Sequence, residues 1–195
     1  MNNVSIEQEV KQYLERSGQR FVDNTAAFDV LDFTILIGES AVFYLEVKEK
    51  RQPYNPANWP GFAPEADLFI LDDLTVRKCL GYAPRAGVLV RDNTQSSYYF
   101  FSVIDLALMP RLRVNRPIQR NAADLKGKWL VNLQNGFQAD NLTDAFAHLN
   151  HYVQALPSIL CEWHPCYGDY VGETIGNGGI VRNPTHWESD IQATR

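Results

Sequence analysis

The strongest constraint on the fold of this 195-residue chain is a charged pair that ends an apolar run. Residues 41–48 read Ala-Val-Phe-Tyr-Leu-Glu-Val-Lys, a composition typical of a β-strand. Because residues 43–45 show no polar alternation, we expect the strand to be buried on both faces. Burying charged groups costs free energy, so Glu46 and Lys48 need a reason to stand there.

The apolar segment before this strand places an aspartate opposite the charged pair. Residues 32–37 are predicted to form a strand that a turn at residues 38–40 joins to the next one, as a hairpin. Alternate side chains of a strand share one face, so Glu46 and Lys48 point the same way. Pairing of the strands about the turn brings Asp32 roughly opposite Glu46.

Two carboxylates and one ammonium at the end of a sheet suit the hydrolysis of a phosphodiester. Carboxylate oxygens are ligands that Mg²⁺ prefers, and a bound Mg²⁺ lowers the pKa of its water and neutralises phosphate oxygens. A lysine beside the metal can orient or deprotonate the attacking water, or stabilise charge that develops on phosphorus. We therefore expect Mg²⁺ as the cofactor, with Mn²⁺ able to substitute.

The same residues resemble a known bipartite motif. Residues 32–35 (Asp-Phe-Thr-Ile) followed by residues 46–48 (Glu-Val-Lys) are similar to the signature of the PD-(D/E)XK nuclease superfamily, with Leu31 where a proline often stands. The superfamily core runs helix, three antiparallel-type strands, helix, strand, which resembles the order predicted over residues 5–71. The resemblance implies an endonuclease that hydrolyses DNA, with both carboxylates on the metal and the lysine acting on the water.

A glutamate on the first helix extends this resemblance. Ser5 is predicted to N-cap that helix through a capping box. Many superfamily members carry a glutamate on this helix, and Glu7 looks like that position, with Glu9 as the alternative. The resemblance implies that Glu7 supports a metal ligand or binds a second metal ion. Asp29 competes in the same way with Asp32, which we prefer because the apolar strand starts directly after it.

The rest of the chain indicates an α/β protein. Further strands are predicted at residues 19–22, 68–71, 86–90, 98–103 and 129–133, a helix or turn at 74–80 and a helix at 143–156. This order predicts a restriction-endonuclease-like core in which helices flank a mixed central β-sheet. We assign residues 1–160 to that nuclease-like domain and residues 161–195, rich in Gly, Asn and Pro, to an irregular C-terminal extension.

Basic residues concentrate in the middle of an acidic chain. The net charge is -5, but residues 77–128 hold ten basic and three acidic residues, so this stretch carries +7 and the remainder -12. We interpret the basic stretch as a phosphate-binding footprint, with ordinary variation of surface charge as the alternative. Residues 110–120 are predicted to form an exposed arm, and an aromatic loop over residues 51–64 either stacks on bases or packs on itself. The residues expected to contact nucleic acid are Lys50, Arg51, Arg111, Arg113, Arg116 and Arg120.

Composition favours a cytoplasmic protein. No apolar run reaches the ~20 residues of a membrane span, no secretory signal is visible, and three scattered cysteines favour a reducing compartment. Zinc binding by Cys161, His164, Cys166 and His186 stays open, although free thiols are the favoured interpretation.

Two other function classes compete with the nuclease. One is a non-catalytic nucleic-acid-binding module that retains the fold, and the other is a structural protein whose hairpin charges merely face water. The intact set of two acids and a lysine favours the nuclease. DNA is the expected partner, with RNA as the alternative, and a homodimer is expected because two strands must be cut.

Overall fold

The structure is a computed structural model, and it describes residues 4–37, 41–55, 58–59, 61–117 and 125–157. The chain divides into two compact units, Met1–Val153 and Gln154–Arg195. The first unit holds both β-sheets and the candidate site. In the second unit the described residues are 154–157, which are helical.

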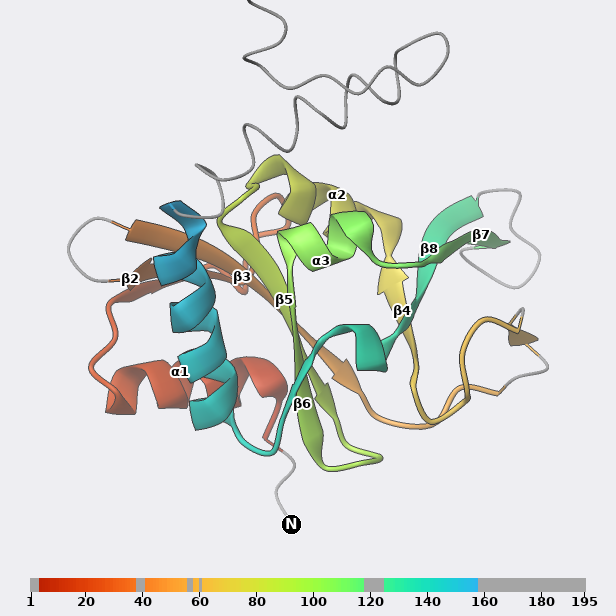
Figure 1. The fold of residues 1–195 in the computed structure, drawn as a ribbon, viewed down its shortest axis with the longest axis horizontal. Coiled ribbons are helices and arrows are strands. Elements are labelled where there is room, and N and C mark those ends of the chain that lie inside the picture. The colour runs from red at the N-terminus through yellow and green to blue at the C-terminus, as the bar shows by residue number, and fades with distance from the viewer. Residues whose placement is uncertain (1–3, 38–40, 56–57, 60, 118–124, 158–195) are drawn as a thin grey trace, which may run out of the picture. The chain divides into compact units, whose positions relative to one another are not determined.

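A six-stranded mixed sheet forms the centre of the first unit, in the order β1-β2-β3-β5-β6-β9 (Figure 1). Its strands are β1 (Phe21–Asp23), β2 (Phe33–Ile37), β3 (Ala41–Lys50), β5 (Ala86–Asp92), β6 (Ser97–Ser102) and β9 (Phe137–Ala139). β1, β2 and β3 are antiparallel neighbours, β5 runs parallel to β3, and the outer pairs are antiparallel. The predicted pairing of residues 32–37 with residues 41–48 is therefore confirmed.

A second sheet has three antiparallel strands in the order β4-β8-β7. They are β4 (Leu68–Asp72), β8 (Leu125–Asn132) and β7 (Leu112–Pro117). The prediction of an exposed arm over residues 110–120 is wrong for residues 112–117, because this segment pairs along β8 with alternating half-buried and exposed side chains. Pro117 is compatible with the strand because it ends an edge strand, where the missing N–H costs no ladder bond.

Helices cover both faces of the six-stranded sheet. They are α1 (Ile6–Arg16), α2 (Asp73–Gly81), α3 (Val103–Leu108) and a helix over residues 142–157, together with the short 3₁₀ helix η2 (Leu133–Asn135). α1 lies beside the helix over residues 142–157, where Tyr13 and Phe146 stack with ring centroids 4.6 Å apart (Figure 1). Ser5 caps α1 as predicted, since its side chain accepts from the Gln8 N–H.

The two faces of β3 belong to different hydrophobic clusters. Phe43, Leu45 and Val47 pack with α1 and the helix over residues 142–157, whereas the opposite face of the sheet packs with α2 and α3. The predicted burial of β3 on both faces is confirmed. Within the described part of the chain, none of the helices has both the length and the apolar character that crossing a bilayer requires.

Candidate active site

The candidate site lies where β3 continues past the start of β2. Pairing of the two strands begins with Phe33 opposite Leu45, so the rest of β3 has no partner in β2. Asp32 directly precedes β2, and its Oδ2 accepts a hydrogen bond of 2.8 Å from the Val47 N–H. The alternative aspartate, Asp29, is exposed in the loop before it. Asp32 is thus the carboxylate at the open edge of β3.

Lys48 links the two carboxylates. Its Nζ lies 2.5 Å from Glu46 Oε1 and 3.7 Å from Asp32 Oδ2, and it donates to the Val47 carbonyl at 3.1 Å. The exposed fractions of the side chains are 34% for Lys48, 19% for Asp32 and 6% for Glu46. The structure therefore brings together the three residues predicted from the hairpin, with Glu46 at the floor and Lys48 toward solvent.

Glu46 carries an unsatisfied oxygen. Thr75 of α2 approaches its Oε1 at 3.5 Å, but among the described residues no hydrogen-bond donor contacts its buried Oε2. Burial raises the pKa of Glu46; the attraction of Lys48 opposes this rise and the charge of Asp32 adds to it. A buried carboxylate oxygen without a donor is an atom that a bound cation would satisfy, so the site fits a metal ion.

Lys48 is held in its charged form. Burial is the largest influence and lowers its pKa, but the attractions of Glu46 and Asp32, with a smaller one from Glu7, together raise it above the ordinary value. The ammonium is therefore suited to donate hydrogen bonds and to stabilise negative charge. It is poorly suited to accept a proton in this arrangement.

Glu7 does not form one cluster with the carboxylates of Asp32 and Glu46. Among the described residues, no group of three or more His, Cys, Asp or Glu side chains could hold a metal ion, so the structure does not support Glu7 as a shared ligand. The reason is that α1 packs on the face of β3 opposite to Glu46, and Glu7 acts on Lys48 only through its charge. The alternative, Glu9, binds Arg91 at 2.5 Å and accepts from the Tyr98 hydroxyl at 2.6 Å.

Lys50 does not reach solvent, so the prediction that it contacts nucleic acid is wrong. Its side chain is fully buried, with Nζ 3.3 Å from Asp92 Oδ2. Nζ also donates to the carbonyls of Glu65 and Ala66. The loop before β4 therefore covers this end of β3, which the strand periodicity does not reveal.

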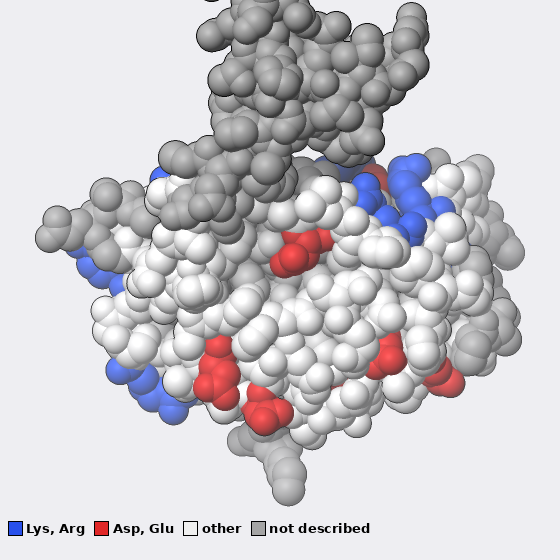
Figure 2. Space-filling view, in the orientation of Figure 1, with Lys and Arg blue, Asp and Glu red and all other residues white. Residues whose placement is uncertain are grey.

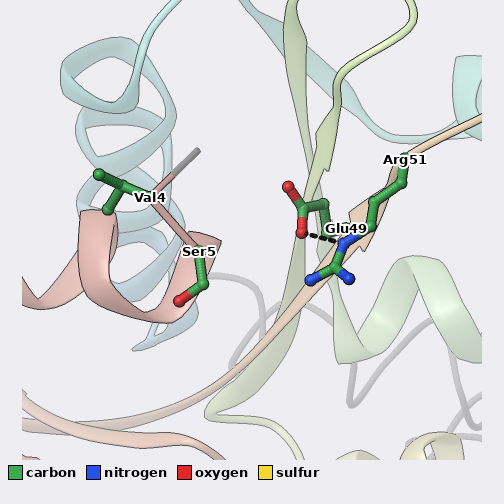
Figure 3. A pocket seen from close by; sticks show the side chains of 4 residues that line it. All are labelled: Val4, Ser5, Glu49 and Arg51. Carbon is green, nitrogen blue, oxygen red and sulfur yellow. Dashed lines mark hydrogen bonds and ion pairs between the residues drawn. The ribbon is translucent and has the colours of Figure 1, made fainter. Parts of the chain in front are cut away.

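Arg51 lies at a hollow that it lines with Val4, Ser5 and Glu49 (Figure 3). Its side chain is 73% exposed, and its Nε lies 2.7 Å from Glu49 Oε2. Burial raises the pKa of Glu49, but hydrogen bonds from Arg91, Arg51 and Asn93 outweigh burial and lower it to about 2. Glu49 therefore stays charged and partly neutralises Arg51.

Two of the predicted phosphate-binding arginines have structural partners. Arg111 donates to the Ala107 carbonyl at 2.7 Å and lies over the Trp129 ring, 4.5 Å from its centroid. Arg113 Nε lies 2.9 Å from Asp73 Oδ1. Both guanidinium groups thus hold the three-stranded sheet to α2 and α3.

The third arginine has an aromatic partner. Arg116 lies over the Trp59 ring, 4.5 Å from its centroid, and β8 brings Lys126 opposite it. Lys126 and Lys128 both pair with Asp72. Lys and Arg side chains gather at the upper right of Figure 2, the region of β7 and β8 in Figure 1.

Five residues named in the sequence analysis lie outside the described part of the chain: Arg120, Cys161, His164, Cys166 and His186.

Thr75 and Lys78 are site residues that the sequence analysis missed. Thr75 contacts Glu46, and the charge of Lys78 opposes, to a small extent, the rise that burial causes in the pKa of Glu46. Their one signal in the sequence is a spacing of three residues, which puts both on one helical face. Nothing in that spacing says that the face would meet β3.

The topology decides the fold. Helix α1 is followed by the antiparallel strands β1, β2 and β3, then by α2 and by β5, which returns parallel to β3. The core has the restriction-endonuclease-like fold. The predicted mixed sheet and flanking helices are confirmed, with one correction: the strand that completes this core is β5, whereas residues 68–71 belong to β4 of the second sheet.

Comparisons with known proteins find distant structural likenesses. The sequence matches no family model and no curated protein. A Holliday junction resolvase from Archaeoglobus fulgidus is 12% identical, with a TM-score of 0.39, over 66% of this chain and 92% of that chain. D212, a nuclease from a fusselovirus, is 9% identical, with a TM-score of 0.42, over 76% and 87% of the two chains. The fold assignment rests on the topology of the chain itself.

Proposed function

We propose that the chain is a metal-dependent nuclease that hydrolyses phosphodiester bonds of DNA. The observation that carries the proposal is the group at the open edge of β3, where Lys48 contacts Glu46 and Asp32 while no described residue donates to the buried Oε2 of Glu46. A bound cation would supply the missing partner of that oxygen.

Asp32 and Glu46 would hold a Mg²⁺ ion, with Mn²⁺ as a substitute. Two carboxylates suffice, because Mg²⁺ keeps several waters and takes further oxygens from a phosphate substrate. The bound ion supplies Lewis acidity and a water of lowered pKa. Glu7 then adds negative charge that favours the ammonium of Lys48, without being a ligand.

Lys48 would bind the phosphate group of the substrate and stabilise the negative charge that develops on its oxygens. Its side chain is 34% exposed and is held charged by its two carboxylate neighbours, so it can face the substrate. Preorganised charge of this kind needs no rearrangement during the reaction, which is why such groups contribute strongly to catalysis.

The test is cleavage of supercoiled, linear and branched DNA by the purified chain. We expect nicking or cutting with Mg²⁺ or Mn²⁺, none after chelation, and none from the Glu46→Gln variant, which keeps the side-chain volume and loses the charge. Cleavage that persists after chelation would contradict the metal requirement. Binding of DNA without any cutting would favour the non-catalytic module.

We propose that the three-stranded sheet supplies a cationic surface for the DNA that this site binds. Asp72 and Asp73 anchor the sheet at the first turn of α2, two to three residues before Thr75. That separation is roughly 3–5 Å along the helix axis. The sheet therefore joins the same helix that contacts Glu46, which supports the proposal that Arg116 contacts a phosphate of the same DNA.

Replacing Arg116 with alanine should weaken DNA binding and reduce the slope of log affinity against log salt by about 1, the effect of one lost phosphate contact. Arg113→Ala is the matched control, because Asp73 already neutralises that guanidinium. Binding titrations at several salt concentrations measure both slopes. Equal slopes for wild type and Arg116→Ala would exclude the contact.

DNA is the proposed substrate and RNA the alternative. A homodimer would supply two sites for two strands, and the proposed location is the cytoplasm. Cleavage of matched DNA and RNA strands and the mass of the protein in solution test the first two points.

A further inference from the structure

An exposed aromatic side chain stands beside the candidate site. Phe28 is 79% exposed, more than any other large apolar side chain in the described part of the protein. It lies between β1 and β2, four residues before Asp32. So little of its surface is buried that fold stability does not explain an aromatic residue at this position.

The loop that carries Phe28 is braced by hydrogen bonds. The Asn24 N–H donates to the Asp32 carbonyl at 2.8 Å, and the Asn24 side chain donates to Thr34 Oγ1 at 3.0 Å. The Ala27 N–H donates to the Asn24 carbonyl at 2.7 Å. These bonds tie the loop to the start of β2, next to Asp32.

Lys78 connects this ring to the carboxylates. Its Nζ donates to the carbonyls of Phe28 and Val30 and lies 4.8 Å from the centroid of the Phe28 ring. Lys78 belongs to α2, as does Thr75, which contacts Glu46. The loop that carries Phe28 and the buried carboxylate of Glu46 therefore both contact α2.

We propose that Phe28 stacks on an unpaired base next to the phosphodiester that the site cuts, so that the enzyme prefers DNA with unpaired bases at the cleavage position. This inference rests on the proposed nuclease function. A flat apolar ring stacks on any base, because every base has a π-face. A base inside a duplex is covered by its neighbours and has no free face for the ring.

The positive charge beside the ring favours a nucleic acid as the occupant. The ammonium of Lys78 lies against Phe28, so a partner that covers the ring also meets a cation. A base with its phosphate satisfies both. The site at Lys48 and Glu46 would bind a phosphate of the same backbone. One strand of DNA would therefore contact the Phe28 ring with a base and the site with a phosphate.

The test compares the affinity for a mismatched or gapped duplex with that for the fully paired duplex of the same sequence. Wild type should prefer the unpaired substrate, and Phe28→Ala should lose about 5- to 150-fold of that preference, the scale of one lost base–aromatic stack. Phe28→Trp should retain it. Leu108→Ala is the matched control, because Leu108 is also strongly exposed, at 69%, but lies on α3.

A fluorescent base analogue at the unpaired position provides a second readout. Wild type and Phe28→Trp should quench it on binding, and Phe28→Ala should not. An unchanged preference, or an equal loss of affinity for paired and unpaired DNA, would overturn the stacking role while cleavage by wild type leaves the nuclease proposal intact. A wild-type protein that cuts no DNA overturns both.

Discussion

Replacement of Lys48 by alanine should lower the rate of DNA cleavage by ~10²-fold or more and leave metal binding in place. The ammonium contacts both carboxylates, yet only they would ligate the ion. Its removal takes a competing cation from Glu46 and Asp32, so the affinity for Mg²⁺ should stay equal or rise. Catalysis loses the charge that faces the phosphate.

The companion variant is Glu46→Ala, which should lose metal binding and cleavage together. For both variants and for wild type, calorimetric titration measures the affinity for Mg²⁺ and a plasmid assay measures the rate of DNA cleavage. The attraction of Lys48 lowers the pKa of Glu46, so that pKa rises further in Lys48→Ala. The titrations are therefore run at about pH 8, well above the ordinary pKa of a glutamate, to favour the ionised carboxylate.

Lys48→Arg is the matched control for charge. Arginine retains the positive charge but holds it in a different geometry. Partial activity would indicate that catalysis needs the charge and that the position of the charge affects the rate. Lys48→Ala that cuts as fast as wild type would exclude the lysine from catalysis. Lys48→Ala that no longer binds metal would mean that the lysine organises the carboxylates.

Replacement of Asp92 by alanine should lower the free energy of unfolding by about 3–5 kcal/mol, the usual cost of leaving one partner of a buried ion pair without the other. Lys50 and Asp92 are both fully buried, and their charged atoms lie 3.3 Å apart. Asp92 also accepts hydrogen bonds from the Thr94 N–H at 2.8 Å and from its hydroxyl at 2.6 Å. The variant leaves the Thr94 donors without this acceptor and the buried ammonium of Lys50 without its counter-charge.

Urea unfolding measures the change. The double variant Lys50→Met/Asp92→Ala should recover part of the loss, because the uncompensated buried charge is gone. The matched control is Lys11→Ala, which breaks an exposed pair with Asp23 and should leave the unfolding midpoint nearly unchanged. A similar midpoint for Asp92→Ala and wild type would show that the buried pair contributes nothing to stability.

The hairpin could be predicted because its determinants are local. Apolar runs on both sides of a short turn predicted two paired strands, and period-2 geometry put Glu46 and Lys48 on one face. The observed register, with Phe33 opposite Leu45, places Asp32 next to Glu46 as the turn position predicted. The metal and the roles of these residues remain predictions.

The packing of α1 and β7 depended on contacts that are distant in the sequence. Glu7 had a pattern match, but α1 packs on the β3 face opposite to Glu46, and no local signal says which face of a sheet a helix covers. Residues 112–117 looked like an arm because of the flanking prolines and arginines. They form β7 because β8 pairs with them and Asp73 binds Arg113.

Lys48 and Lys50 show where the sequence stops being informative. They are two residues apart on one strand, so periodicity assigns them to the same face and the same environment. In the structure, Lys48 is at the open edge beside Asp32, whereas Lys50 is covered by residues 65–66 and paired with Asp92. The sequence by itself determined which face each side chain takes, because that follows from backbone geometry. Only the tertiary structure decided which lysine meets solvent, because that depends on the loop and the strand that pack over each one.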